Sequence, residues 1–245
     1  MPDTFDLLVL SSAYTTDENR WRVFRESAKR YSVPLHVLGA GSNSYDMMTA
    51  IDNGLEFLHR SAATHVVITD AYDVIVNHWD GRRVGYIVDS APGLILSVES
   101  NIWPPGPWEE SYARLDPSTY YWRAICGGQM AGRRQMLIDL WEALRSRLAA
   151  GGATRGGTTQ EILHQLFAAG QGVPITLDLE CRLFQSMLGP HVDKIACCPH
   201  PDLPRWQAYN TVTRSVPMFL HFNGQGSPDG RTPPALFEWE ERLRQ

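Results

Sequence analysis

The sequence has no long apolar segment and no pattern of a secretion signal. No stretch reaches the roughly 18 consecutive apolar residues that a membrane-spanning helix requires. The start of the chain, from Met1 to Leu10, carries no positively charged region ahead of an apolar one. We therefore expect a cytoplasmic protein without a membrane partner.

Clusters of basic residues are absent as well. The chain has 22 Lys and Arg residues against 27 Asp and Glu residues, which gives a net charge of −5, and the basic residues form no run. Proteins that bind nucleic acid usually carry a basic patch, so we expect no nucleic-acid partner. An anionic ligand would need a metal ion or backbone amides to bind to this chain.

Cysteines are few, and their spacing excludes two common uses. The chain has four, at Cys126, Cys181, Cys197 and Cys198, and two of them are adjacent. This spacing matches neither a zinc finger nor a disulfide framework. We expect free thiols, which agrees with a cytoplasmic protein.

The apolar residues that are present predict an α/β fold. They make up 43% of 245 residues, enough for one core, and we take residues 1–245 as a single domain. Short apolar runs predict buried strands at 5–10, 33–38, 65–69, 94–98 and 218–220. Helical spacing predicts helices at 19–30, 47–59, 133–149 and 158–169 and at the C-terminus. This alternation predicts a mostly parallel central sheet flanked by helices.

Polar residues follow three of the predicted strands. Ser11 and Ser12 come after the first strand, Asp70 after the strand at 65–69, and Glu99 after the strand at 94–98. In parallel sheets, ligands bind beyond the carboxyl ends of the strands. The sequence therefore predicts one site built from three loops.

Asp70 and Asp73 are the sharpest local feature. Two carboxylates this close together repel each other unless a cation lies between them. Mg²⁺ and Mn²⁺ prefer oxygen ligands and often also bind substrate phosphates. The pair therefore suggests a metal that neutralises a diphosphate, and the alternative is a turn or a helix cap.

His221 is the second feature, at the end of the last predicted strand. The residues that follow it, Phe222, Asn223 and Gly224, lead into a glycine-rich loop. Histidine is a common metal ligand, although a single histidine more often has a structural role. Asn223 and Gly224 fit a tight turn equally well.

The order of several short blocks is more specific than any one of them. The blocks are Asp70-Ala71-Tyr72-Asp73, Ser97 to Pro104, Cys126 to Gly132, Thr158-Thr159-Gln160, Leu177 to Gln185, and His221-Phe222-Asn223-Gly224. This series resembles the glycosyltransferase domain of the procollagen lysyl hydroxylases and of the related collagen galactosyltransferases. The resemblance extends from Leu7 to about Gly226.

The resemblance implies a GT-A (Rossmann-like) domain and a metal-dependent glycosyltransferase of the hexosyltransferase type. It implies a UDP-sugar donor and Mn²⁺ (or Mg²⁺), and we expect a small-molecule or peptide acceptor. The nucleotide and metal half would span about 1–105, and the acceptor half about 106–245.

The resemblance also implies roles for individual residues. Asp70, Asp73 and His221 would bind the metal. The implied donor contacts are Ser11 and Ser12 at the nucleoside, Tyr72 at the uracil, Asn223 and Gly224 at the diphosphate, and Glu99 and Trp103 beside the sugar. Asp178 would face the sugar and the acceptor.

The sequence departs from the family pattern mainly on the sugar side. An Asp-Asp-Gln block tied to sugar binding and transfer is Thr158-Thr159-Gln160 here. Two lysines expected from the family are absent: Gly54 stands in place of one, and Gly226-Ser227 in place of the other. We therefore place the catalytic role on Asp178 and Glu99, with Thr158 and Thr159 at the substituted positions.

Two other functions fit the same features. The losses at Thr158-Thr159 and at the lysine positions also fit a catalytically degenerate nucleotide-sugar-binding protein. A metal-dependent nucleotidyltransferase or sugar-nucleotide hydrolase on a similar fold would share the metal and the nucleotide. Release of UDP together with a sugar-bearing product distinguishes the transferase from both.

Overall fold

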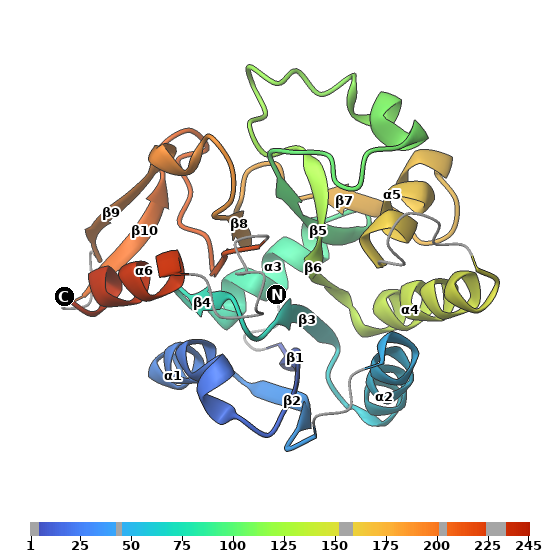
Figure 1. Ribbon diagram of the computed structural model, residues 1–245, viewed down its shortest axis with the longest axis horizontal. Coiled ribbons are helices and arrows are strands. Elements are labelled where there is room, and N and C mark those ends of the chain that lie inside the picture. The colour runs from blue at the N-terminus through green and yellow to red at the C-terminus, as the bar shows by residue number, and fades with distance from the viewer. Residues whose placement is uncertain (1–4, 43–45, 152–158, 201–204, 224–233) are drawn as a thin grey trace.

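A computed structural model describes residues 5–42, 46–151, 159–200, 205–223 and 234–245. Its centre is a six-stranded sheet in the order β2-β1-β3-β6-β5-β7 (Figure 1). The strands are β1 (Leu7–Thr15), β2 (Leu35–Ala40), β3 (His65–Asp70), β5 (Leu94–Glu99), β6 (Ala124–Arg133) and β7 (Ile175–Leu177). Only β6 runs antiparallel to its neighbours in this sheet, so the predicted α/β class with a mostly parallel sheet is confirmed.

Helices cover both faces of this sheet. They are α1 (Arg22–Arg30), α2 (Met47–Arg60), α3 (Gly81–Ser90), α4 (Arg134–Ala149) and α5 (Thr159–Ala169). A further helix, α6 (Pro234–Arg244), lies outside the central sheet. Three short 3₁₀ helices are η1 (Glu18–Trp21), η2 (Pro107–Tyr112) and η3 (Val192–Lys194). Among the described residues, no helix is both long and apolar enough to cross a membrane.

The continuous apolar runs of the strands are explained by cores on the two faces of the sheet. Successive side chains of a strand point to opposite faces. On β3, Val66 packs with α2, α4 and α5, whereas Val67 packs with α1 and α3. Both faces are therefore buried, as expected for strands that read as uninterrupted apolar segments.

A smaller sheet sets the position of the candidate site. It contains β4 (Val74–Val76), β11 (Phe219–His221) and β8 (Phe184–Ser186), with β11 in the middle. His221 pairs with Val74 in the antiparallel register of β11 and β4. This pairing places His221 beside Val74, the residue that follows Asp73.

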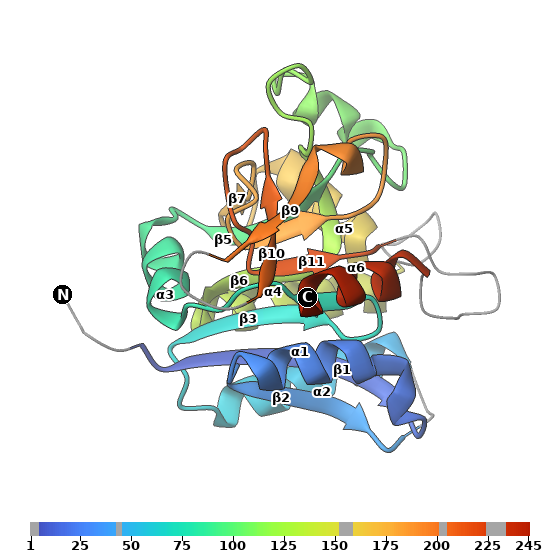
Figure 2. The same ribbon diagram turned by 90° about the vertical axis from the view of Figure 1, so that its left-hand side faces the viewer.

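A third sheet completes the fold outside the central sheet. It pairs β9 (Ile195–Pro199) with β10 (Trp206–Asn210) in antiparallel fashion, and α6 packs beside β10 (Figures 1 and 2). The apolar residues that join these elements include Ala208 of β10 and Trp239 of α6. The sequence did not predict this pair of strands.

Gly54 illustrates how one departure from the family pattern is used in the fold. A Cβ atom at Gly54 would lie 1.8 Å from the ring of Trp141, so α2 approaches α4 closely at this position. The resemblance described for the sequence implies a lysine at this position. In this chain the position serves helix packing and brings no cation to the site.

Candidate metal centre and adjoining pocket

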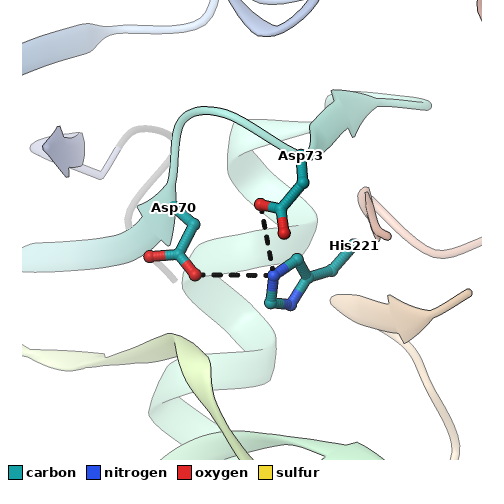
Figure 3. Close-up of side chains that lie close together, drawn as sticks. All are labelled: Asp70, Asp73 and His221. Atoms are coloured by element: carbon teal, nitrogen blue, oxygen red, sulfur yellow. Dashed lines mark ion pairs between the residues drawn. The ribbon is translucent and has the colours of Figure 1, made fainter. Parts of the chain in front are cut away.

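The structure brings Asp70, Asp73 and His221 together from three segments. Asp70 is the last residue of β3, Asp73 precedes β4, and His221 ends β11 (Figure 3). The Nε2 atom of His221 lies 3.4 Å from Asp70 Oδ2 and 3.4 Å from Asp73 Oδ1. The backbone N–H of Phe222 donates to the carbonyl of Asp73 at 2.8 Å and fixes this approach.

The charges of this cluster depend on one another. Burial alone would lower the pKa of His221, but the negative charge of Asp73 and the hydrogen bonding of the imidazole N–H to both carboxylates raise that pKa well above its usual value. Burial acts to raise the pKa of Asp73, but the positive charge of His221 and the hydrogen bonds to the carboxylate together outweigh it, so that the pKa is lowered. Without a metal, the proton on His221 therefore partly neutralises the carboxylates.

The cluster fits a divalent cation. One possible ligand atom from each of the three residues lies within 4.8 Å of the other two. The Asp70 side chain is 55% exposed and open to an incoming ion, whereas that of His221 is only 3% exposed. Two carboxylates and one imidazole form a donor set that suits Mn²⁺, and Mg²⁺ less well because it prefers oxygen ligands.

Gly128 leaves the space that the cluster needs. It lies on β6, and a Cβ atom there would be 2.4 Å from both Asp70 Oδ2 and His221 Cε1. Any side chain at this position would therefore push these two groups apart.

The cluster forms part of the wall of a pocket of roughly 550 Å³. This volume is typical of a small-molecule site. The lining residues are Asp70, Asp73, Glu99, Asn101, Ile102, Trp103, Cys126, Gly128, Gln160, Leu188, His221 and Asn223.

The comparisons with known proteins identify the family of this chain. Residues 3–228 match the family model of the PLOD GT domain. The chain belongs to this family. The match covers most of the chain and includes both carboxylates and the histidine of the cluster.

A solved structure supports the fold of this PLOD GT domain. It is the crystal structure of a glycosyltransferase involved in the glycosylation of the major capsid of PBCV-1. The similarity has a TM-score of 0.58 at 12% identity and covers 97% of this chain and 99% of the other. No curated protein matches the sequence. Family and fold together support glycosyl transfer and are consistent with a GT-A type domain.

A second part of the pocket wall of this PLOD GT domain is built around Glu99. Its Oε1 accepts a hydrogen bond from Gln160 Nε2 at 2.7 Å, and its Oε2 accepts one from Asn223 Nδ2 at 3.0 Å. Burial raises the pKa of Glu99. The oxygen of Asn223 accepts from the Ser186 hydroxyl at 2.7 Å, and that of Gln160 accepts from the Gly127 N–H at 2.9 Å. The orientation of both amides is thereby fixed.

Trp103 forms the rim of the same pocket. Its side chain is 52% exposed, although it is one of the largest apolar groups of the chain. The three expected metal ligands thus lie around the same cavity as Glu99, Trp103 and Asn223. Their roles toward a donor stay predictions.

Other residues that the resemblance selected lie elsewhere. Ser11 is buried, and its hydroxyl donates to the Thr69 carbonyl at 2.6 Å between β1 and β3. Ser12 and Tyr72 are partly buried, and neither is among the described lining residues of the pocket. Their predicted contacts with the nucleoside would require a surface beside the pocket.

The substituted block of the sequence is described only in part. Thr159 is the first residue of α5, is partly buried and does not line the pocket. Thr158 and Gly224 lie outside the described residues.

The structure gives Asp178 a place that differs from the expected one. Its Oδ1 accepts from the N–H of Arg182, and its Oδ2 accepts from the N–H groups of Leu183 and Phe184, each at 2.9 Å. It does not line the pocket of the metal cluster but a separate depression beside α3. The geometry therefore favours a structural role that holds the loop before β8, against the catalytic role predicted for it.

Sequence reasoning assigned no role to three residues of the site. Gln160 links Glu99 to the backbone of β6, Gly128 makes room for the cluster, and the Cys126 sulfur lies 3.5 Å from His221 Nδ1. All three belong to blocks that carry the family resemblance. That membership was the available signal, but no local pattern indicated what each residue does.

Proposed function

We propose that this PLOD GT domain transfers a sugar from a UDP-sugar to a small-molecule or peptide acceptor, with Mn²⁺ (or Mg²⁺) bound by Asp70, Asp73 and His221. The observation that carries the proposal is the convergence of these three side chains in the wall of one pocket. Family membership supplies the reaction class. The cytoplasmic location inferred from the sequence is part of the same proposal.

When bound, a divalent cation would neutralise the diphosphate and stabilise the departing UDP as a Lewis acid. The three side chains would hold it at the pocket wall. His221 would offer Nε2, since this nitrogen faces both carboxylates. The chain needs such help because the described lining of the pocket includes no lysine or arginine.

The remaining lining residues would orient the donor sugar and keep water away. Glu99, Gln160 and Asn223 are held rigid by mutual hydrogen bonds, so they can bind hydroxyl groups with little loss of side-chain entropy. Ile102 and Leu188 add apolar surface to the pocket. A dry and fixed environment favours transfer to an acceptor over hydrolysis.

Glu99 is the strongest candidate for proton transfer from the acceptor. The described lining has three carboxylates, and the other two belong to the metal cluster. Its pKa is raised by burial, which brings it nearer to the value that a general base requires. Both of its oxygens already accept a hydrogen bond, so an acceptor hydroxyl would share Oε1 or Oε2 with an amide.

Calorimetric titration with UDP, with and without Mn²⁺, tests the metal-bridged donor. We expect UDP to bind at least about tenfold more tightly with Mn²⁺, because one ion would join the carboxylates to the diphosphate. Equal UDP affinity under the two conditions would contradict the proposal. Asp139→Ala, which removes an exposed carboxylate on α4, is the matched control and should retain the metal effect.

A second measurement separates the transferase from its rivals. Incubation with UDP-sugars and a panel of acceptors should release UDP together with a sugar-bearing product. Free sugar as the only product would indicate a hydrolase. Tight UDP-sugar binding without turnover across the panel would indicate a binding protein, the function that the change at Thr158-Thr159 also fits.

A further inference from the structure

Two side chains of α5 hold the same backbone oxygen at the pocket rim. Gln160 Nε2 lies 2.6 Å and His164 Nε2 lies 3.0 Å from the carbonyl oxygen of Trp103. Residues four apart lie on one face of a helix, so both reach the same point. A carbonyl oxygen has two lone pairs and can accept both bonds. The backbone of Trp103 is thereby fixed where its exposed side chain lines the pocket.

The hydrogen-bonding roles at His164 follow from its partners. A carbonyl oxygen can only accept, so His164 Nε2 carries a hydrogen. The side chain is fully buried, and burial lowers the pKa of His164, which keeps the ring neutral. Its Nδ1 atom therefore has a free lone pair, which the Tyr112 hydroxyl reaches as a donor at 2.6 Å.

Aromatic packing holds this pair in place beneath the rim. The His164 ring stacks on Trp108, with 5.6 Å between ring centroids and 4° between planes. The indole N–H of Trp108 donates to the Pro104 carbonyl at 3.0 Å. The residues after Trp103 are thus tied to η2, and η2 is tied to α5 through Tyr112 and His164.

We propose that Tyr112 and His164 are positioning residues that set the place of Trp103 at the pocket rim, and thereby the affinity for the substrate bound there. His164 does not line the pocket and acts through the Trp103 carbonyl. The identity of the substrate as a nucleotide sugar rests on the proposed function. The positioning of Trp103 by Tyr112 and His164 is independent of it.

A purely packing role for His164 makes a different prediction. Packing depends on the size and apolar surface of the ring, and not on which nitrogen carries the hydrogen. Positioning depends on an N–H group at the site of Nε2. In His164→Gln, the longer side chain can bring an amide N–H near that site, whereas the shorter side chain of His164→Asn places it nearer the site of Nδ1.

The test uses the full chain labelled with 5-fluorotryptophan. The ¹⁹F resonance of Trp103 is identified by its loss in Trp103→Phe. We expect His164→Gln to keep this resonance near its parent position and His164→Asn to shift or broaden it. Tyr112→Phe should still shift this resonance, but by less, because Nε2 can still donate while Nδ1 loses the hydroxyl that holds the ring in place.

Substrate affinity provides the second readout. One buried hydrogen bond is worth about 0.5–1.5 kcal/mol, so His164→Asn should raise the KM for the UDP-sugar roughly two- to tenfold, and more than it lowers kcat. His164→Gln should stay within about twofold of the parent, within the lower limit of that range. Affinity for UDP alone should change less than affinity for the UDP-sugar in every variant.

Two results would overturn the proposal. One is an unchanged Trp103 resonance in folded His164→Asn, since Gln160 alone would then hold the rim. The other is equal disturbance by His164→Gln and His164→Asn, which would indicate packing. If His164→Asn fails to fold, the Trp103 resonance in Tyr112→Phe decides, and no shift there overturns the proposal. Failure of the proposed function would appear instead as no UDP-sugar binding by the parent chain, with the ¹⁹F results unaffected.

Discussion

The two walls of the pocket differ in how their charges are compensated. The metal wall, defined as Asp70, Asp73 and His221, gathers charged groups whose pKa values depend on one another. The amide wall, defined as Glu99, Gln160 and Asn223, surrounds one buried carboxylate with neutral donors. The amide wall is satisfied by its own hydrogen bonds. The metal wall needs a proton or a cation from outside, which is why we assign the ion to it.

Removal of a carboxylate from the metal wall should have the largest effect. We expect Asp73→Ala to lower Mn²⁺ affinity by more than about a hundredfold, because a ligand matters more than the outer contacts that typically cost 10–100-fold. The Mn²⁺ enhancement of UDP binding should disappear with it. Calorimetry measures both quantities, with Asp139→Ala as the control. Retention of the enhancement in Asp73→Ala would remove the distinction between the walls.

Metal binding should also release a proton from the metal wall. The pKa of His221 is raised well above its usual value, so we expect His221 to carry a proton at neutral pH in the metal-free protein. A histidine binds a metal only in its neutral form, so the proton competes with the ion, and Mn²⁺ affinity should fall about tenfold per unit as the pH is lowered below that pKa.

Titrations in buffers of different ionisation enthalpy count this proton. About one proton should be released per Mn²⁺ bound at pH 7. Asp139→Ala should release the same number. A count of zero would mean that His221 is neutral before the ion arrives, or that it does not bind the ion.

Two adjacent glycines allow each wall to be disturbed separately. A Cβ atom at Gly128 would meet Asp70 and His221, whereas one at Gly127 would lie 2.9 Å from Gln160 Cβ. Overpacking costs about 1–3 kcal/mol. Gly128→Ala should therefore weaken Mn²⁺ binding by roughly tenfold or more, and Gly127→Ala should leave it nearly unchanged.

The two alanine variants serve as controls for each other in the same strand. Gly127→Ala should instead weaken binding of the UDP-sugar relative to UDP, because it displaces Gln160. Equal loss of Mn²⁺ affinity in both variants would show that the walls move as one unit.

The sequence predicted the metal wall better than the amide wall, and the reason is the kind of signal each provides. The Asp70 and Asp73 carboxylates are close in sequence, and their repulsion alone suggests a cation. His221 could be added only through the family resemblance, because the register of β11 with β4 is a long-range contact. In the amide wall, Glu99 was predicted from its place after a strand and Asn223 from the family resemblance, but Gln160 has no comparable signal, since an amide in a helix is usually exposed.

The strand that supports both walls was missed for a related reason. No strand was predicted at Cys126-Gly127-Gly128, because glycine weakens a strand. In β6 these glycines are required by the close approach of Gln160 on one side and of Asp70 and His221 on the other. Here the demands of the site outweigh local preference, so the strand could not be recognised from its composition.

Contacts behind the metal wall should have smaller effects. The Cys126 sulfur lies 3.5 Å from His221 Nδ1, on the side of the ring opposite the carboxylates. Cys126→Ala removes this partner and should lower Mn²⁺ affinity by up to about tenfold, the low end for such outer contacts. Cys126→Ser supplies a hydroxyl acceptor and should stay within about threefold. Cys198→Ser, a partly exposed thiol on β9, is the control, and equal effects in all three variants would count against the contact.

Asp178 should have the smallest effect on the pocket, although it matters for stability. Its carboxylate accepts three backbone N–H groups, and the amide of Asp178→Asn would present N–H to at least one of these donors. An unsatisfied buried donor costs about 1–3 kcal/mol, so the free energy of unfolding should fall by that amount in urea denaturation. UDP–Mn²⁺ affinity and turnover, measured at a temperature where the variant stays folded, should remain within about twofold, since a structural contact supplies no general acid–base catalysis.

A general base at Asp178 would instead make turnover drop by roughly 10²–10⁴. Such a drop with UDP–Mn²⁺ binding intact would return Asp178 to the catalytic role that the sequence indicated, and would require the loop before β8 to turn toward the pocket when substrate binds.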